Sequence, residues 1–135
     1  MTDDGRLTTM EPDPAWDEES YADTVETLAA WADDVVFKVW GGDWCKDCRS
    51  QLPAFGAALD AAGVPDDRIE HYPVEKADDG SKIGPQVEAY DIELIPTVVV
   101  ERADGGDELA RFVESADRPI AVFLADRLAG LEADA

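Results

Sequence analysis

Helix-type and strand-type segments alternate along this chain, and its last two strand-type segments follow each other directly. Apolar residues recur at three- and four-residue steps in the helix-type segments, whereas β-branched and aromatic residues fill the strand-type ones. The expected helices are 16–33, 45–62, 85–90 and 118–131, and the expected strands are 35–40, 68–74, 97–102 and 109–113. Strands separated by helices pair in parallel through crossovers, and the final hairpin adds antiparallel strands to the same sheet. The order α-β-α-β-α-β-β-α therefore predicts an α/β fold with helices on both faces of a mixed sheet.

The chain has 135 residues, which is enough for one domain with a substantial core. Residues 15–132 are predicted to form this domain, and the acidic, turn-rich segment 1–14 is predicted to be a disordered tail. This segment lacks the basic start and the apolar stretch of a signal peptide. No apolar run approaches the roughly 20 residues that a membrane span needs. We therefore expect a cytoplasmic protein without membrane contact.

The charge of this sequence is unusual, because 32 Asp and Glu stand against 11 Lys and Arg, for a net charge of −21. The acidic residues are spread along the whole chain. Such a surface repels itself unless salt screens it, and the Debye length falls from about 10 Å at 0.1 M to about 3 Å at 1 M salt. The pattern resembles the surfaces of proteins from extreme halophiles, and an acidic partner-binding patch is the alternative. Nucleic acid is not expected as a partner, since phosphates require a basic surface.

Cys45 and Cys48 stand where the first expected strand ends and the second expected helix begins. The unpaired N–H groups and the positive dipole end of a helix stabilise an anion, so a thiolate is favoured at Cys45. Lys46 favours this thiolate further, whereas Asp43 and Asp47 oppose it. The spacing of three places the two sulfurs one helical turn apart, close enough to form a disulfide. Cys45 is predicted to attack a substrate disulfide, and Cys48 is predicted to resolve the mixed disulfide.

A Cys-x-x-Cys pair can also be half of a zinc site. Zinc generally takes four nitrogen or sulfur ligands, and His71 is the one histidine beyond the two thiols. A metal is therefore not expected. A soft-metal carrier on a ferredoxin-like fold is an alternative, although that fold would have a different strand–helix order.

Several stretches together resemble the thioredoxin family: Trp44-Cys45-Lys46-Asp47-Cys48, Pro53 in the following helix, and Tyr90-Asp91-Ile92 with Ile95-Pro96-Thr97. The Trp-Cys-x-Asp-Cys form, followed by Arg49 and by 111–115, looks like the small thioredoxin-like proteins that vary the central dipeptide. The resemblance covers nearly the whole chain. It implies a four-stranded mixed sheet flanked by four helices, a dithiol exchange activity, and a cis peptide bond at Ile95–Pro96 that faces the cysteines.

The resemblance also implies roles for residues around the motif. Pro96 would turn the Ile95 backbone outward, where its N–H and C=O can pair with an extended substrate segment. Trp44 would shield the attacking thiol and present an apolar surface to substrates. Lys38 stands where many thioredoxins carry a buried acid. Either it points under the motif and favours a thiolate at Cys48, or it extends outward to solvent.

The function expected from these residues is reduction of protein disulfides by the Cys45–Cys48 dithiol, without another cofactor. The expected partners are disulfide-containing proteins and a separate electron donor of the thioredoxin reductase type. The central pair Lys46-Asp47 influences the reduction potential, so the direction of exchange stays open. The alternative function is a thioredoxin-fold binding module that uses the dithiol for redox sensing or metal delivery without turnover.

Overall fold

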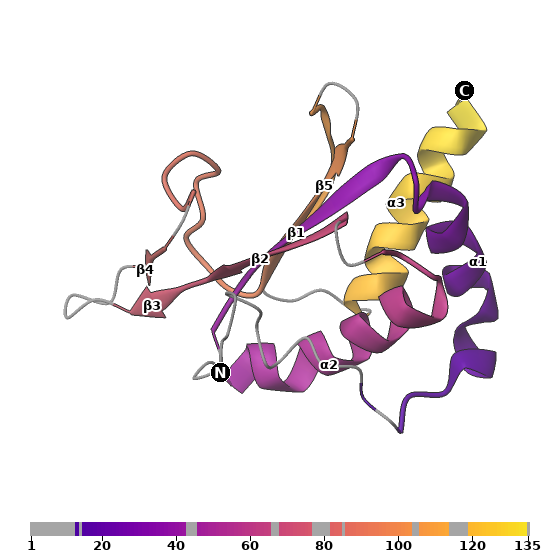
Figure 1. Cartoon of the computed structure of the whole chain (residues 1–135), viewed down its shortest axis with the longest axis horizontal. Coiled ribbons are helices and arrows are strands. Elements are labelled where there is room, and N and C mark those ends of the chain that lie inside the picture. The colour runs from indigo at the N-terminus through magenta and orange to yellow at the C-terminus, as the bar shows by residue number, and fades with distance from the viewer. Residues whose placement is uncertain are drawn as a thin grey trace.

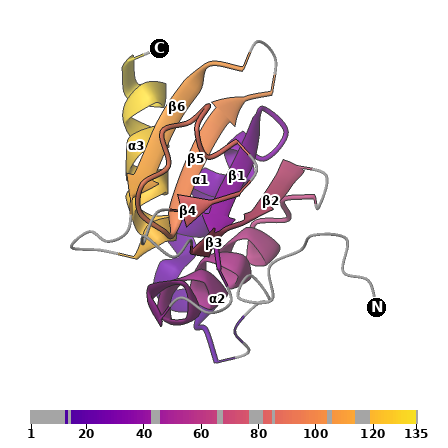
Figure 2. The same ribbon diagram turned by 90° about the vertical axis from the view of Figure 1, so that its left-hand side faces the viewer.

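A computed structural model describes residues 13, 15–42, 46–65, 68–76, 82–84, 86–103, 106–113 and 119–134. Its main sheet has the strand order β2-β1-β5-β6 (Figure 2). The strands are β1 Val35–Gly41, β2 Ile69–Pro73, β5 Thr97–Arg102 and β6 Glu108–Val113. β2 runs parallel to β1, β5 runs antiparallel to β1, and β6 runs antiparallel to β5. The expected α/β class with a four-stranded mixed sheet is confirmed. The tail predicted for 1–14 lies outside the described residues apart from Asp13.

The described parts of the chain contain three α-helices: α1 Ala22–Trp31, α2 Lys46–Ala61 and α3 Ile120–Asp134. These helices contact one another and lie together on one side of the main sheet (Figures 1 and 2). None of the helices in the described ranges combines the length and the apolar character that crossing a bilayer requires.

Alternate side chains of the strands form an apolar face toward these helices. Phe37 of β1 contacts Phe55 of α2 with 6.2 Å between ring centroids, and Phe112 of β6 contacts Phe123 of α3 with 5.4 Å. Successive residues of a strand point to opposite faces, so Val39 shares this face with Phe37, and both are 0% exposed. Burial of apolar surface is worth about 25 cal/mol per Å², so this layer is the main source of stability.

The opposite face of the sheet is covered by the segment 86–91, which forms turns (Figure 2). The helix expected over 85–90 is therefore wrong. Gln86 has φ 62° and Asp91 has φ 56°, values in the left-handed region that an α-helix of L-residues does not use. The N–H of Ile92 donates to the C=O of Val87 at 2.8 Å and closes the turn. The expectation of helices on both faces is corrected in the same way, because the α-helices described here lie on one face.

The helix expected over 16–33 is divided into α1 and a preceding 3-10 helix, η2 Glu18–Tyr21. Asp17 caps η2, because its carboxylate accepts hydrogen bonds from the backbone N–H of Glu19 at 3.2 Å and from Ser20 Oγ at 2.7 Å. Such local side-chain bonds compete with a regular α-helical start, so the α-helix begins only at Ala22.

A second, two-stranded sheet is an addition to the fold expected from the sequence. It pairs β3 Glu75–Lys76 with β4 Lys82–Ile83, and the intervening residues 77–81 lie outside the described part of the chain. Gly84 follows β4 at a close approach of two chain segments. A Cβ at this position would lie 2.8 Å from the carbonyl oxygen of Pro73, so the site requires glycine.

Candidate functional site

Cys48 lies in the first turn of α2, which begins at Lys46. Its side chain is 0% exposed. The backbone N–H of Gly42, directly after β1, donates a hydrogen bond to the sulfur of Cys48 at 3.4 Å. One face of α2 packs into the core at steps of three and four residues, with Cys48, Leu52, Phe55 and Leu59. The Cys48 sulfur is therefore shielded from solvent and has a backbone donor directed at it.

The other residues of the motif are described only in part. Trp44 and the predicted nucleophile Cys45 lie outside the described residues, as does the side chain of Asp47. Lys46 is exposed at the start of α2. The roles of Cys45 as attacking thiol, of Cys48 as resolving thiol and of Trp44 as a shield stay predictions.

Ile95 and Pro96 lie directly before β5, and the peptide bond between them is cis. The register pairs Trp40, near the end of β1, with Thr97, at the start of β5. Because β1 and β5 are antiparallel neighbours, the Ile95-Pro96 segment and Gly42 lie at the same end of the sheet. The structure thus brings Cys48 and the predicted substrate-pairing segment to one end of the molecule.

Two exposed apolar side chains flank this end of the sheet. Leu94 and Val113 are each 42% exposed. Val113 is the cross-strand partner of Thr97, and Leu94 accepts a hydrogen bond on its carbonyl oxygen from Thr97 Oγ1 at 2.6 Å. Exposed apolar groups beside a segment predicted to bind substrate are suited to contact an unfolded or extended chain.

Lys38 lies on the sheet face away from α2. It neighbours Phe37 in β1, whose ring points toward α2, so the two side chains leave the strand on opposite sides. Lys38 Nζ lies 3.2 Å from Glu70 Oε1 and 3.5 Å from Glu101 Oε1, and the Lys38 side chain is 17% exposed. The sheet separates Lys38 from Cys48. Neither expected placement, under the motif or outward to solvent, describes this paired and largely buried lysine.

Tyrosine hydroxyls complete the surroundings of Lys38. Its Nζ lies 5.8 Å from the ring centroid of Tyr72 and 5.5 Å from that of Tyr90. The Tyr72 hydroxyl donates to Glu70, and the Tyr90 hydroxyl donates to Glu101 at 2.5 Å. Each glutamate therefore has both the ammonium of Lys38 and a tyrosine hydroxyl as partners.

The pKa values of this group respond to burial and to these partners. Burial and the bond to Glu70 raise the pKa of Tyr72 to about 12. The Tyr72 hydroxyl and then Lys38 lower the pKa of Glu70. For Lys38, burial acts to lower the pKa, but its bonded partners Tyr90 and Glu70 outweigh burial and raise it. At neutral pH Lys38 is therefore an ammonium, Glu70 is a carboxylate, and Tyr72 and Tyr90 are neutral phenols.

The sequence carried a signal for this group that motif analysis missed. Lys38 stands between the buried apolar residues Phe37 and Val39 in β1, and Glu70 follows Ile69 in β2. A charged residue between buried apolar neighbours in a strand predicts a charged side chain on the opposite face of the sheet. The partners on β5 depend on strand pairing, which the pattern alone does not give.

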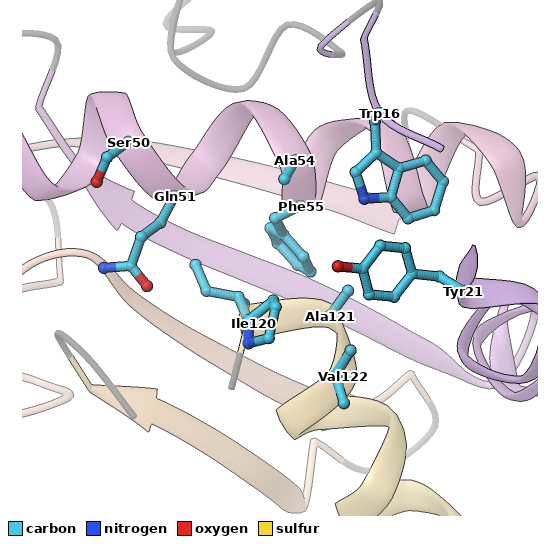
Figure 3. A pocket seen from close by; sticks show the side chains of 10 residues that line it. Trp16, Tyr21, Ser50, Gln51, Ala54, Phe55, Ile120, Ala121 and Val122 are labelled. Atoms are coloured by element: carbon cyan, nitrogen blue, oxygen red, sulfur yellow. The ribbon is translucent and has the colours of Figure 1, made fainter. Parts of the chain in front are cut away.

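An apolar pocket of about 220 Å³ lies between the N-terminal segment, α2 and α3 (Figure 3). Its lining consists of Trp16, Tyr21, Ser50, Gln51, Ala54, Phe55, Pro119, Ile120, Ala121 and Val122. Trp16 and Tyr21 stack at 5.3 Å with 10° between their planes. They lie at one end of the pocket, and Ser50 and Gln51 lie at the other (Figure 3). The pocket therefore begins on α2 in the turn after Cys48.

Comparison with known proteins adds little to this geometry. No protein-family model matches the sequence, and no curated protein matches it. Among solved structures, the chain is similar to a thioredoxin-fold protein from Helicobacter pylori, with 15% sequence identity and a TM-score of 0.37. The match covers 84% of this chain and 94% of that chain. A likeness at this level carries no information on function, so the candidate site rests on its own residues.

Proposed function

We propose that this chain is a thiol–disulfide oxidoreductase that reduces protein disulfides through Cys45 and Cys48. The observation that carries the proposal is the position of Cys48, which is buried in the first turn of α2 with the N–H of Gly42 on its sulfur. A resolving thiol needs this arrangement, because it must stay shielded until a mixed disulfide forms one turn away. The three-residue spacing to Cys45 supplies that neighbour.

The proposed reaction has two exchange steps. The Cys45 thiolate attacks one sulfur of the substrate disulfide, so a Cys45–substrate bond forms and the substrate S–S bond breaks. The first substrate thiolate leaves and takes a proton from solvent. The Cys48 thiolate then attacks the Cys45 sulfur, which releases the second substrate thiolate and leaves a Cys45–Cys48 disulfide. The substrate has gained two electrons and the protein has lost two, which a separate dithiol reductase restores.

Charge on the Cys48 sulfur is stabilised by the start of α2. The Gly42 N–H is directed at this sulfur, and the positive end of the helix dipole lies at the same place. Burial opposes this charge, because the sulfur leaves water. These opposing effects favour a thiol that reacts chiefly when the sulfur of Cys45 is held beside it.

Substrate binding is assigned to the Ile95-Pro96 segment and the apolar groups around it. An extended substrate would pair with the backbone of Ile95 and contact the exposed side chains of Leu94 and Val113. Trp44 would add apolar surface on the motif side. Main-chain pairing favours many sequences equally, so the enzyme would accept a range of proteins with exposed disulfides.

Trapping of the mixed disulfide tests the proposed function. Reduced wild-type protein, Cys48→Ser, Cys45→Ser and the double variant are incubated with insulin, and covalent adducts are measured by mass spectrometry. Cys48→Ser is expected to accumulate the adduct, whereas Cys45→Ser and the double variant form little. Adduct formation by Cys45→Ser would reverse the assigned roles. Wild-type protein that is oxidised once per molecule and then stops, even with a regenerating dithiol, would support the redox-sensing or metal-delivery module instead.

A further inference from the structure

Five side chains on the sheet face away from the α-helices form one connected group, here named the Lys38 cluster: Lys38, Glu70, Tyr72, Tyr90 and Glu101. Four of them belong to the three adjacent strands β2, β1 and β5. The fifth, Tyr90, belongs to the segment 86–91 that covers this face. The cluster therefore ties a covering segment without regular secondary structure to the rigid sheet.

Besides its contact with Lys38, Tyr90 makes three contacts with the sheet. Its hydroxyl donates to Glu101 at 2.5 Å, and its ring packs on Trp40 with 4.8 Å between centroids. Its backbone carbonyl accepts a hydrogen bond from Arg111 Nη1 at 2.8 Å. Glu108 holds Arg111 in turn, with bonds of 3.0 Å and 2.9 Å to two guanidinium nitrogens. The segment 86–91 is thus attached to the sheet through both the side chain and the main chain of Tyr90.

The chain from this segment runs directly into the proposed substrate-binding residues. Ile92, which closes the turn on Val87, is 3% exposed, and Ile95 is 3% exposed. Residues 92–96 belong to no helix or strand. They connect the segment 86–91 directly to the start of β5, so a displacement of 86–91 is passed along the chain to the Ile95 backbone.

Lys38 is the charge that makes this attachment possible. Glu70 and Glu101 lie on the strands at either side of β1, and both point at the same ammonium. Without it, the carboxylates of Glu70, which is 44% exposed, and Glu101, which is 13% exposed, would face each other across β1, and like charges repel. Glu101 would then move toward solvent and withdraw the acceptor that the Tyr90 hydroxyl uses.

We propose that the Lys38 cluster holds the segment 86–91 on the sheet and thereby sets the position of the Ile95 backbone, so that Lys38 is a positioning residue for substrate binding. The inference rests on the proposed disulfide exchange for its functional part. Its structural part, that Lys38 governs the order of 86–96, does not depend on whether the protein reduces disulfides. The two parts are measured separately.

Hydrogen exchange measured by mass spectrometry tests the structural part. Lys38→Met keeps the length of the side chain and removes its charge, and Arg102→Met removes an exposed charge from the same sheet as a matched control. Exchange of the amides in 86–96 is expected to become at least tenfold faster in Lys38→Met and to stay unchanged in Arg102→Met and Lys38→Arg. If Lys38→Met fails to fold, Tyr90→Phe removes one hydroxyl and is expected to raise the exchange of the same peptides. Unchanged exchange in folded Lys38→Met or in Tyr90→Phe overturns the proposal.

Steady-state kinetics test the functional part. With a protein disulfide as substrate, Lys38→Met is expected to raise KM several-fold at nearly unchanged kcat, and Lys38→Arg is expected to restore KM. With 2-hydroxyethyl disulfide, which cannot pair with the Ile95 backbone, wild type and Lys38→Met are expected to react at equal rates. The reduction potential of the dithiol is expected to stay the same. A changed potential with normal exchange in 86–96 would make Lys38 a tuning group and overturn the positioning role. A wild-type protein that reduces no disulfide would refute the proposed function, while the exchange data would still decide the structural part.

Discussion

The backbone N–H of Gly42 donates a hydrogen bond to Sγ of Cys48 at 3.4 Å, and this contact joins the end of β1 to the first turn of α2. The sulfur is held inside the core by the same helix face that packs on the sheet. A reagent can therefore reach Cys48 only if the start of α2 opens.

Alkylation of Cys48 is expected to be slow in the folded protein. In Cys45→Ser, the rate of Cys48 labelling by iodoacetamide should be at least about 100-fold lower in buffer than in urea, because local opening must precede the reaction. The labelled fraction is read by mass spectrometry over time. Labelling at the rate of the unfolded chain would mean that the thiol is exposed in solution.

Salt is expected to stabilise the protein. The net charge of −21 causes repulsion that falls as the Debye length shortens, so the melting temperature should rise from about 0.1 M to about 2 M KCl. Each kcal/mol of relieved repulsion corresponds to about 4 °C for a domain of this size. The control neutralises three exposed acids, in Asp33→Asn, Asp60→Asn and Glu93→Gln. This variant should melt higher at low salt and respond less to KCl, and a flat wild-type curve would favour the acidic partner-binding patch.

Filling the apolar pocket is expected to stabilise the fold. Ala54 lines the pocket from α2, and Ala54→Leu adds apolar atoms with little loss of helix propensity. The expected gain is about 1 kcal/mol, since a buried methylene is worth about 0.8 kcal/mol and part of the new side chain stays outside. Ala30→Leu, at an exposed position of α1, is the matched control and should change little. Urea unfolding measures both, and a loss of stability in Ala54→Leu would mean that the pocket cannot accept the added volume.

Alkaline pH is expected to weaken the fold through Tyr72. Its pKa is raised from 10.0 to about 12, so the unfolded chain gives up this proton at lower pH than the folded one. The stability that the shift provides is complete below pH 10 and is lost as the pH rises to 12. The pKa of Lys38 is also raised, so Lys38 acts in the same direction as Tyr72.

Tyr72→Phe is the comparison that isolates this effect. It removes the titrating hydroxyl and keeps the ring that stacks on Trp40 at 4.6 Å. The difference in unfolding free energy between wild type and Tyr72→Phe, measured in urea from pH 8 to pH 12, should shrink as the pH rises. A difference that stays constant over this range would contradict the role of the Tyr72 proton.

The sheet could be predicted because its signal is local. The run Val98-Val99-Val100 is apolar and β-branched, which predicts a strand buried on both faces, and the run from Val35 to Trp40 likewise predicts a strand. The cover of the other face could not be predicted in the same way. Gln86 takes a left-handed conformation that nothing in its residue type favours, and Tyr90 is held by groups that are close to it only after the sheet has formed.

The candidate site also has one part that the local sequence predicts and one part that depends on strand pairing. The place of Cys48 at a helix start followed from the strand–helix junction, because a helix must begin soon after the glycines that end β1. The direction of Lys38 depended on register, since a shift of one residue moves a side chain to the other face of a sheet. The sequence left two directions open for Lys38, and the contact of Phe37 with Phe55 fixes the direction in the structure.

Apolar packing holds the helices on one face of the sheet, and ion pairs and hydrogen bonds hold the segment 86–91 on the other. The two faces are therefore expected to respond differently to salt. Concentrated salt screens the repulsion between the surface carboxylates, so the fold as a whole becomes more stable. The same ions compete for the carboxylates that keep Tyr90 in place, although partial burial limits their reach. Two salt optima are therefore expected. The amides of 86–91 should exchange most slowly at a lower salt concentration than the one that gives the highest melting temperature. A salt concentration that raises the melting temperature would then also increase amide exchange in the segment 86–91.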